Sequence, residues 1–349
     1  MKLIIQIPCY NEANTLEATL ANLPQKIRGI ETIEFLVIDD GSTDDTAQVA
    51  RRGGVHHIIQ HEYNKGLASS FADGISFALA LGADIVVNTD GDNQYNGQDI
   101  PKLVKPIVEK KADIVVGCRP IADHPEFSFF KKVLQRVGSW FVRKISKTNV
   151  RDVASGFRAY SREACFRLFL HTTFSHCIET LIQAGNSGLK VLSVDIQVNP
   201  KTRDSRLYKN IFQYLYRSSE TILSMFILYR PGFFFFICSM LSFFCSMLLG
   251  VRFIYLTYYI ATPDLHRTYL ASLILLSIFA TFGMILLLLA LFGELSKGQR
   301  KLLENIIINQ RKMLLSNSQE DISKDIIQAV EKLTDGYVGE RRKFQVYKP

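Results

Sequence analysis

Short apolar runs alternate with longer segments of helical periodicity across the first 200 residues of the chain. Short apolar runs of this kind are typical of buried strands. The predicted strands are residues 3–7, 33–38, 85–87, 114–116 and 191–194, and the predicted helices are residues 14–23, 44–51, 67–81 and 101–110. Strands that alternate with crossover helices predict an α/β domain with a mostly parallel sheet. Ligands of such a sheet gather at the loops that follow the carboxyl ends of its strands.

Two later runs carry no charged residue. Residues 232–251 form a charge-free run of 20 residues, and residues 269–292 form one of 24. A helix that crosses a membrane needs about 20 apolar residues, so both runs are predicted to be transmembrane helices. The alternative is a pair of buried core helices, which seldom stay free of charge over about six turns. The short polar segment 261–268 joins the runs as a hairpin, which places both long flanks on one side of the membrane.

The composition locates the charge of the chain. Of its 349 residues 48% are hydrophobic, and the net charge is +8. Residues 1–200 hold 22 basic and 22 acidic residues, whereas residues 201–349 hold 19 and 11, so the excess lies around the apolar runs. A basic surface is typical of proteins that bind nucleic acid or an anionic membrane. Because these charges flank the apolar runs and no RNA-binding motif is present, the membrane is the predicted partner and nucleic acid is not.

The flanking basic residues also predict an orientation. The positive-inside rule places both flanks in the cytoplasm. The apolar run that follows Lys2 ends at Pro8, which is too short for a signal peptide. We therefore expect a two-span membrane protein whose α/β domain and both termini are cytoplasmic. The six cysteines have no metal-type spacing and are expected to be reduced thiols.

Amphipathic patterns lie on both sides of the hairpin. Residues 207–230 place apolar side chains on one stripe and polar side chains on another, which predicts a helix in the membrane interface. Packing against the sheet domain is the alternative. A second stripe after residue 292 indicates another interfacial helix or an oligomer contact, and we expect a homo-oligomer. The predicted divisions of the chain are residues 1–206, 207–230, 231–260, 269–292 and 293–349.

Polar clusters follow four of the predicted strands. They comprise residues 8–12, 39–44, 90–94 and 117–119. Helix capping and turn formation explain any single cluster equally well. Four clusters at the carboxyl ends of strands in one sheet are better explained by a shared binding site.

The third cluster has the character of a metal site. Asp90 and Asp92 form an acid-x-acid pair, and Gln94 follows two residues later. Carboxylate and amide oxygens suit Mg²⁺ or Mn²⁺, which keep positions for water and phosphate oxygens. The chain has neither a Gly-x-x-x-x-Gly-Lys loop nor a Gly-x-Gly-x-x-Gly turn, which disfavours a P-loop ATPase and a dinucleotide-dependent dehydrogenase. The remaining common user of a metal-held nucleoside diphosphate is a sugar-nucleotide transferase.

Six motifs occur in a fixed order along the chain. They are Pro8-x-Tyr10-Asn11-Glu12, Asp39-Asp40-Gly41-Ser42, Asn64-x-Gly66, Asp90-x-Asp92-x-Gln94, Gly117-x-Arg119 and Ser155-Gly156-Phe157-Arg158. This set resembles family 2 glycosyltransferases, in particular the branch of dolichyl-phosphate mannose synthases and bacterial polyprenyl-phosphate glycosyltransferases. The resemblance covers about residues 1–206, and the two-span hairpin is similar to the membrane-anchored members. It implies a GT-A fold and an inverting transfer of a sugar from a UDP- or GDP-sugar to a polyprenyl phosphate, either undecaprenyl or dolichyl phosphate.

The resemblance also implies roles for single residues. The nucleotide-sugar site would comprise Pro8, Tyr10, Glu12, Asp40, Asp90, Gly91 and Arg206, with Asp40 accepting a hydrogen bond from the base. Asp92 and Gln94 would ligate Mg²⁺ or Mn²⁺, and the acceptor phosphate would be bound by Arg119, Arg136 and Ser139. The implied catalytic residues are Asp92, Arg119, Arg136 and Glu179. In two places the chain departs from the family: Gly91 stands where an alanine is usual, and the segment around Arg203 is shorter than in the mannose synthases.

The chemistry of a lipid phosphate acceptor fits the residues present. No pair of a nucleophile and a base is evident, but a phosphate monoester with a second pKa of about 6 is largely dianionic at neutral pH and is itself the nucleophile. The protein then has to supply positive charge for the acceptor and for the departing diphosphate. Glu179 is expected to orient the acceptor side, with a solvated helix position as the alternative. The expected surface or structural histidines are His56, His57, His61, His171 and His176.

Two other interpretations are weaker. A processive polysaccharide synthase would normally carry Gln-x-x-Arg-Trp and a larger set of membrane helices, and the sequence has neither. A non-catalytic membrane scaffold or nucleotide-sugar sensor would be favoured by loss of the metal ligands, which the chain retains. The motifs do not distinguish among donor sugars or prenol lengths, nor between a bacterial membrane and the endoplasmic reticulum. The compact two-span form favours a bacterial inner membrane.

Overall fold

The computed structural model describes residues 1–120, 129–170, 176–200, 211–260, 270–317 and 345–347, without the side chains of 129–137, 211–215, 259–260, 316–317 and 345–347. The chain forms two compact units. The first comprises Met1–Ile222 and Ile307–Pro349, and the second comprises Leu223–Ile306. The resemblance assigns Arg136 and Arg206 to the substrate site and leaves the role of Arg203 open. The side chains of all three lie outside the described set.

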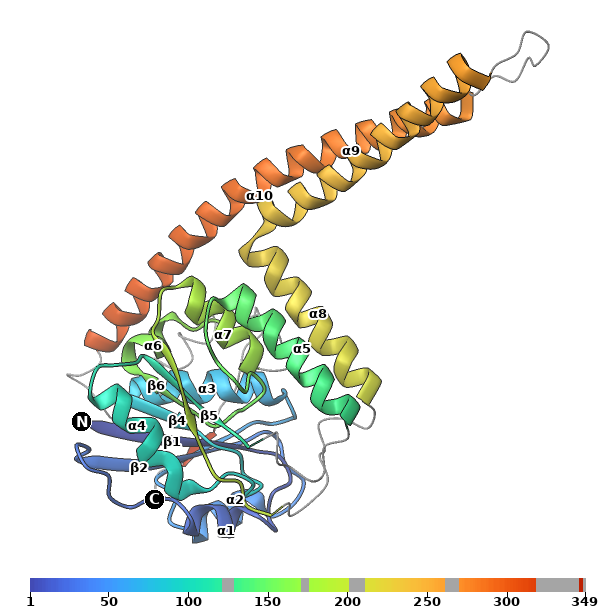
Figure 1. Cartoon of the computed structure of the whole chain (residues 1–349). Helices are drawn as coiled ribbons and strands as arrows, with labels where there is room; N and C mark the ends of the chain where they lie inside the picture. The colour runs from blue at the N-terminus through green and yellow to red at the C-terminus, as the bar shows by residue number, and fades with distance from the viewer. Residues whose placement is uncertain (121–128, 171–175, 201–210, 261–269, 318–344, 348–349) are drawn as a thin grey trace. The chain divides into compact units, whose positions relative to one another are not determined.

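Within these residues, eight strands form one mixed sheet (Figure 1). The strands are β1 Lys2–Cys9, β2 Thr32–Asp39, β3 His57–Gln60, β4 Ile85–Asn88, β5 Ile114–Cys118, β6 Arg158–Ser161, β7 Val191–Asp195 and β8 Gln345–Tyr347. Their order is β7-β5-β6-β4-β1-β2-β3-β8. β6 runs antiparallel to β4 and β5, and β8 runs antiparallel to β3, whereas the other pairs are parallel. The carboxyl ends of six strands therefore lie along one edge of the sheet.

Helices cover both faces of this sheet. The helices of the first unit are α1 Leu16–Ala21, α2 Thr46–Arg52, α3 Leu67–Ala80, α4 Ile100–Val108, α5 Phe129–Ser146, α6 Arg162–Arg167 and α7 His176–Asn186, with a short 3-10 turn, η1, at Gly97–Asp99. On one face, apolar residues of α1, α2 and α4 share a core with Leu3, Ile5 and Ile7 of β1. On the other, α3 packs on β1 and β2 and contacts α6 and α7. Because β1 is covered on both faces, its residues 3–9 are all buried.

The fold confirms the predicted α/β class and five of its strands, which are β1, β2, β4, β5 and β7. It adds three strands that the apolar pattern did not predict. β3 has only two apolar residues, Ile58 and Ile59. β6 begins with Arg158, whose side chain is nevertheless fully buried. β8 pairs with the edge strand β3 from the far end of the chain, a partnership that no local pattern could predict.

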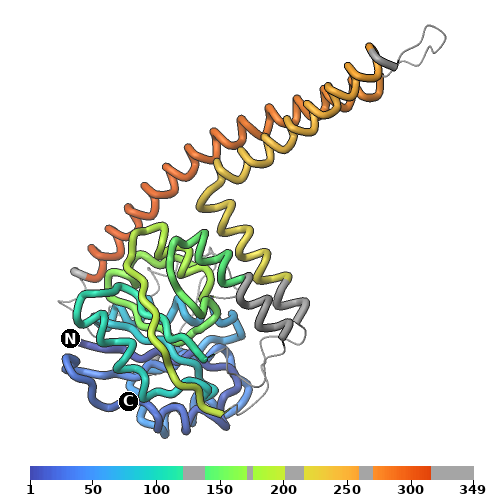
Figure 2. The backbone as a smooth tube through the Cα atoms, in the orientation of Figure 1, coloured from blue at the N-terminus to red at the C-terminus, as the bar shows by residue number. Residues whose placement is uncertain are grey.

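The second unit is built from two long apolar helices. The segment 207–230 contains α8 Ile211–Tyr229, and α9 Pro231–Tyr255, the π-type turn η3 Leu256–Ile260 and α10 Leu270–Asn317 follow. α9 and α10 run side by side (Figure 2). The hydroxyls of Ser239, Ser242 and Ser246 donate to the α10 carbonyls of Gly283, Phe279 and Leu276 at 2.8, 2.7 and 3.1 Å. Each helix is long and apolar enough to cross a membrane. Their other large apolar side chains are mostly exposed, as suits a lipid-facing surface.

The helix after residue 292 differs from the expected separate segment. α10 continues without a break from Leu270 to Asn317. Its last turns belong to the first unit, where the guanidinium of Arg311 donates to the Phe166 and Leu168 carbonyls at 3.4 and 3.3 Å. Lys312 forms an ion pair with Glu163 of α6 at 2.7 Å. The apolar stripe noted in the sequence, from Leu295 to Leu314, is exposed in this chain.

Candidate active site

The loops that follow β1 and β2 are hydrogen-bonded to each other and together form one wall of the candidate site. The amide of Asn11 donates to the Ser42 hydroxyl at 2.9 Å, and the amide of Thr43 donates to Asn11 Oδ1 at 2.8 Å. The amide of Glu12 donates to the Thr46 hydroxyl at 2.8 Å. The first and second polar clusters of the sequence therefore form one continuous structure.

The predicted nucleotide-binding residues take different positions in this wall. Pro8 is buried within β1, Glu12 is 5% exposed and Tyr10 is 39% exposed. Asp40 is buried, and both of its oxygens accept hydrogen bonds from the protein. Its Oδ1 accepts from the Lys65 amide and its Oδ2 from the Gly66 amide, both at 2.9 Å. Asp40 thus organises the β3–α3 loop, and its contact with a base stays a prediction.

The Asp90–Gly91–Asp92 segment forms the centre of the edge. The hydroxyls of Thr15 and Thr19 lie 2.9 and 3.1 Å from the Gly91 carbonyl, which ties the segment to α1. The amide of Gln94 donates to Asp92 Oδ1 at 3.1 Å, so the segment turns back on itself. Burial and the neighbouring Asp92 carboxylate raise the pKa of Asp90 to about 7.

This donor set fits a hard divalent cation. Two close carboxylates repel each other, and a bound cation would relieve that repulsion. Among the described side chains, no three His, Cys, Asp or Glu groups are arranged to hold a metal by themselves. The Asp92 carboxylate and the side-chain oxygen of Gln94 would therefore supply part of the coordination shell. Water and diphosphate oxygens would complete it, as is typical of Mg²⁺ sites.

The space around Gly91 is too small for the alanine that is usual at this position in the family that the sequence resembles. A Cβ atom added at Gly91 would lie 2.8 Å from Cys9 Sγ and 3.4 Å from Glu12 Cγ. The backbone of Gly91 lies outside the left-handed region, so an alanine would be strained by this contact and not by its φ angle. The thiol of Cys9 occupies the volume that an alanine would need.

We predict that Gly91→Ala destabilises the first unit by about 1–3 kcal/mol, because it overpacks a buried site. In a Cys9→Ala background the same substitution is expected to cost less than about half as much, since the Sγ atom is gone. Denaturant unfolding of the four proteins in the cycle measures this coupling. Equal costs of Gly91→Ala in both backgrounds would show that Cys9 is not the obstacle.

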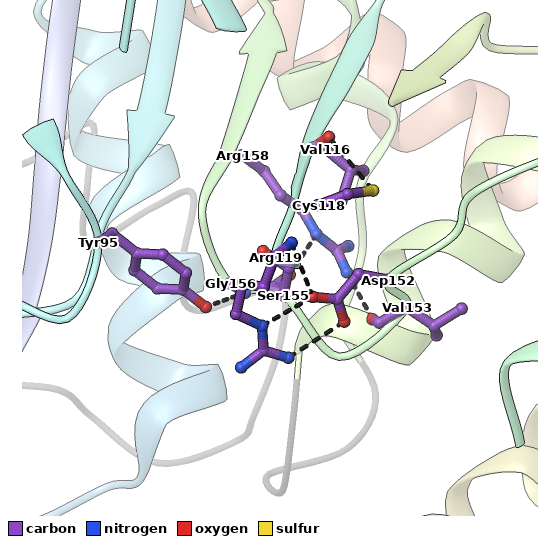
Figure 3. A network of polar contacts seen from close by, with 9 residues as sticks. All are labelled: Tyr95, Val116, Cys118, Arg119, Asp152, Val153, Ser155, Gly156 and Arg158. Atoms are coloured by element: carbon purple, nitrogen blue, oxygen red, sulfur yellow. Dashed lines mark hydrogen bonds and ion pairs between the residues drawn. The ribbon is translucent and has the colours of Figure 1, made fainter. Parts of the chain in front are cut away.

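Arg119 and Asp152 form a bidentate ion pair (Figure 3). The charge of Arg119 also acts on Asp90 of the acidic segment. Arg119 Nε and Nη2 donate to the two Asp152 oxygens at 2.7 and 3.1 Å. The Arg119 side chain is 25% exposed and that of Asp152 only 1%. Asp152 therefore fixes the guanidinium, while donors of Arg119 outside this pair are available for a phosphate.

The loop that carries the Ser155–Arg158 motif lies against Asp90. A Cβ atom added at Gly156 would lie 3.4 Å from Asp90 Oδ1. The Gly156 amide donates to the Tyr95 hydroxyl at 3.1 Å, and its carbonyl accepts from the Asn88 side chain at 2.9 Å. The structure thus brings the acidic segment, Arg119 and the Ser155–Arg158 motif into one place.

Arg158 is fully buried and donates hydrogen bonds to the backbone of the loop at Val153 and Ser155 (Figure 3). Its Nε donates to the Ser155 carbonyl at 2.7 Å and its Nη2 to the Val153 carbonyl at 2.8 Å. Its Nη1 donates to the Cys177 carbonyl and the Thr180 hydroxyl of α7 at 2.8 and 2.9 Å. Arg158 is therefore a structural cation that links the loop to α7.

The remaining predicted residues have mixed outcomes. Glu179 is fully buried on α7, with the Gln183 amide 3.4 Å from its Oε1, so the alternative of a solvated helix position is wrong. His176 is also buried and stacks on Phe71 with ring centroids 4.2 Å apart, as a structural histidine would. Ser139 is buried on α5. None of the six cysteines, which all lie in the described part of the chain, forms a disulfide.

No sequence motif pointed to Asp152. Its signal was an acidic residue three positions before the Ser155–Arg158 motif, but the partner Arg119 lies 33 residues earlier. The partners of His61 were missed as well. They are Asp40 and Asp73, at 2.7 and 3.2 Å from the two ring nitrogens.

Comparisons with known proteins agree with this geometry. Residues 4–169 match the family model described as Glycosyl transferase family 2. A UDP-N-acetylglucosamine–dolichyl-phosphate N-acetylglucosaminyltransferase of Methanococcus voltae is 30% identical over 213 residues, which are 55% of this chain and 83% of that protein. An undecaprenyl-phosphate mannosyltransferase of Micrococcus luteus is 28% identical over 166 residues, which are 46% of this chain and 66% of that protein.

A solved structure gives the fold. The crystal structure of glucosyl-3-phosphoglycerate synthase from Mycobacterium tuberculosis, in complex with Mn²⁺, uridine diphosphate and glucosyl-3-phosphoglycerate, matches with a TM-score of 0.50 at 20% identity. The match covers 65% of this chain and 78% of that chain. Together with the mostly parallel mixed sheet, it confirms the GT-A fold.

Proposed function

Because the chain belongs to glycosyl transferase family 2, we propose that it is a membrane-bound, metal-dependent enzyme that transfers a sugar from a UDP- or GDP-sugar to a polyprenyl phosphate. The observation that carries the proposal is the joint presence of Asp90, Asp92 and the Arg119–Asp152 pair at one sheet edge in a chain with two membrane-length apolar helices. The two relatives named for dolichyl-phosphate and undecaprenyl-phosphate acceptors support a lipid phosphate as the acceptor.

The donor half of the reaction uses the wall formed by the β1 and β2 loops. Tyr10, Glu12 and Asp40 would bind the nucleoside, with Pro8 shaping the strand beneath them. Asp92 and Gln94 would hold Mg²⁺ or Mn²⁺ beside the diphosphate, with Asp90 and the Gly91 backbone next to it. The cation, when bound, would neutralise the charge that develops on the departing diphosphate.

The acceptor half uses positive charge. A phosphate monoester is largely dianionic at neutral pH, so its oxygen attacks the anomeric carbon without a strong general base. The bond from that carbon to the diphosphate oxygen breaks, the nucleoside diphosphate leaves, and the configuration inverts. Arg119, held in place by Asp152, would bind the acceptor phosphate together with Arg136 and Ser139, and Arg206 would cover the donor. Glu179 would orient this side through the buried α7.

The membrane part would present the lipid. The hairpin of α9 and α10 would span the bilayer, with α8 as an interfacial helix. Basic residues on both flanks support a cytoplasmic location of the GT-A unit and of both termini. We propose the bacterial inner membrane as the location and a homo-oligomer as the assembly, with a polyprenyl phosphate as the acceptor.

An assay of the purified chain in detergent tests the proposal. The protein is incubated with undecaprenyl phosphate, Mg²⁺ or Mn²⁺ and a panel of UDP- and GDP-sugars, and nucleoside diphosphate release and the lipid product are followed by mass spectrometry. We expect one donor to give a prenyl phosphate sugar, and EDTA to abolish the product. Binding of a nucleotide without transfer from any donor would favour a scaffold or sensor instead. Product formed only on a soluble or growing glycan would exclude the lipid acceptor.

A further inference from the structure

Three buried ionisable side chains meet beneath the β3–α3 loop. Asp40 follows β2, His61 follows β3, and Asp73 lies in the middle of α3. Their exposed fractions are 4%, 3% and 1%. His61 Nδ1 lies 2.7 Å from Asp40 Oδ1, and His61 Nε2 lies 3.2 Å from Asp73 Oδ2. Both ring nitrogens therefore face a carboxylate.

This arrangement favours a doubly protonated ring. A neutral imidazole has one nitrogen with a lone pair, and that lone pair would point at a carboxylate. Burial and the nearby Lys65 ammonium lower the pKa of His61, but the hydrogen bond to Asp40 and the close Asp73 carboxylate outweigh them and raise it above its ordinary value. Burial raises the pKa of Asp40, but hydrogen bonds from His61 and from the Lys65 and Gly66 amides lower it overall.

The cluster fixes the wall formed by the β1 and β2 loops, where the donor nucleotide would bind. Asp40 receives the amides of Lys65 and Gly66, and Gly66, at φ +90°, begins α3. The same loop passes so close to Gly41 that an added Cβ atom there would lie 2.5 Å from the Tyr63 carbonyl carbon. A shift of the His61 ring would thus move Asp40 and the loop together, while Asp73 on α3 holds the other side of the ring.

We infer that His61 is a positioning residue of the donor site: anchored by Asp73, it fixes the Asp40 carboxylate and the Lys65–Gly66 turn, and so sets the affinity for the nucleoside diphosphate part of the donor. The inference rests on the proposed function, because it requires that the wall containing Asp40 binds a nucleotide. It assigns His61 no part in the bond-making step.

Isothermal titration of the purified full-length chain with UDP and with GDP, in the presence of Mg²⁺, provides the test. His61→Gln can satisfy one carboxylate but not both, and we expect it to weaken binding of the preferred nucleotide by about tenfold or more. Asp73→Asn, which contacts no nucleotide in this scheme, is expected to weaken binding in the same direction. In donor assays, the KM for the sugar nucleotide should rise while kcat changes by less than about threefold.

His57→Gln is the matched control. His57 lies at the start of β3, four residues before His61, and pairs with Glu34 at 2.8 Å. Its substitution is expected to leave nucleotide binding unchanged, because it lies at the opposite end of the strand from the site. Nucleotide affinity within twofold of the unmodified protein in a folded His61→Gln variant would overturn the inference, as would failure of the unmodified protein to bind either nucleotide.

A spectroscopic measurement keeps the inference testable if His61→Gln does not fold. Selective ¹⁵N labelling of histidine should show that the His61 ring keeps both ring protons to a higher pH than an ordinary histidine does, because its pKa is raised. A ring that loses its second proton at or below the ordinary pH would overturn the inference. Nucleotide binding that depends on His61, combined with no transfer to a lipid phosphate, would support the inference while refuting the proposed acceptor.

Discussion

Replacing Asp92 by asparagine is expected to lower the rate of sugar transfer by about a thousandfold while leaving the fold intact. Asp92 Oδ1 accepts the Gln94 amide at 3.1 Å, and an asparagine Oδ1 can accept the same hydrogen bond. The substitution therefore keeps the shape of the segment and removes only the negative charge that would hold the cation. Initial rates at saturating Mg²⁺ or Mn²⁺ and donor measure the effect, and thermal unfolding checks the fold.

Asp195→Asn is a suitable control for this measurement. Asp195 also ends a strand of the parallel set, β7, but its side chain is 76% exposed and pairs only with Arg151 among the ion pairs described. Its substitution should leave the rate nearly unchanged, because exposed ion pairs contribute little. Retention of more than about a tenth of the activity by Asp92→Asn would exclude a charged metal ligand at this position.

Replacing Arg158 by methionine is expected to destabilise the GT-A unit by about 3–5 kcal/mol. The side chain is fully buried and donates to three carbonyls and a hydroxyl, which would all lose this donor at once. Methionine fills much of the volume but offers no hydrogen bond. The unfolding midpoint, followed by circular dichroism in detergent, should fall by about 10 °C or more.

Arg167→Met isolates the effect of burial on the same chemical change. Arg167 is 39% exposed, and its Nε pairs with Glu163 on the same helix at 2.7 Å. Such a partly exposed pair contributes about 1 kcal/mol or less, so the midpoint of this variant should shift only slightly. Similar midpoints for the two variants would mean that the Arg158 hydrogen bonds do not stabilise the fold.

The class of the fold could be predicted from local patterns, because buried parallel strands are short apolar runs that any window of the sequence reveals. The polar clusters could be predicted to lie close together, because loops at the carboxyl ends of parallel strands share one edge of the sheet. β6 could not be predicted in this way, since its buried Arg158 looks like a surface residue until its partners on α7 are known. Pairing partners are a property of the strand order, and the strand order is not local.

The same limit applies within the site. Asp92 and Gln94 stand out because their motif is contiguous, whereas Asp152 and Asp73 gain their roles from residues on other elements. Asp152 meets Arg119 across 33 positions, and His61 meets Asp40 across 21. Glu179 was ambiguous because an acidic residue on a helix is usually solvated, and only the packing of α7 shows that it is fully buried. No proline occurs between residues 292 and 317, and the two glycines there, Gly293 and Gly298, do not interrupt the helix, so α10 does not end where its apolar run ends.

The contact between Gly91 and Cys9 constrains the order in which these two positions can change over generations. A lineage that acquires alanine at position 91 first must pass through an overpacked ancestor, whereas one that first acquires a smaller residue at position 9 passes through an ancestor with a small void. The second ancestor loses less stability, because neighbouring side chains can move into the small void beside the glycine. Interconversion between the glycine and alanine forms of this acidic segment should therefore proceed through position 9.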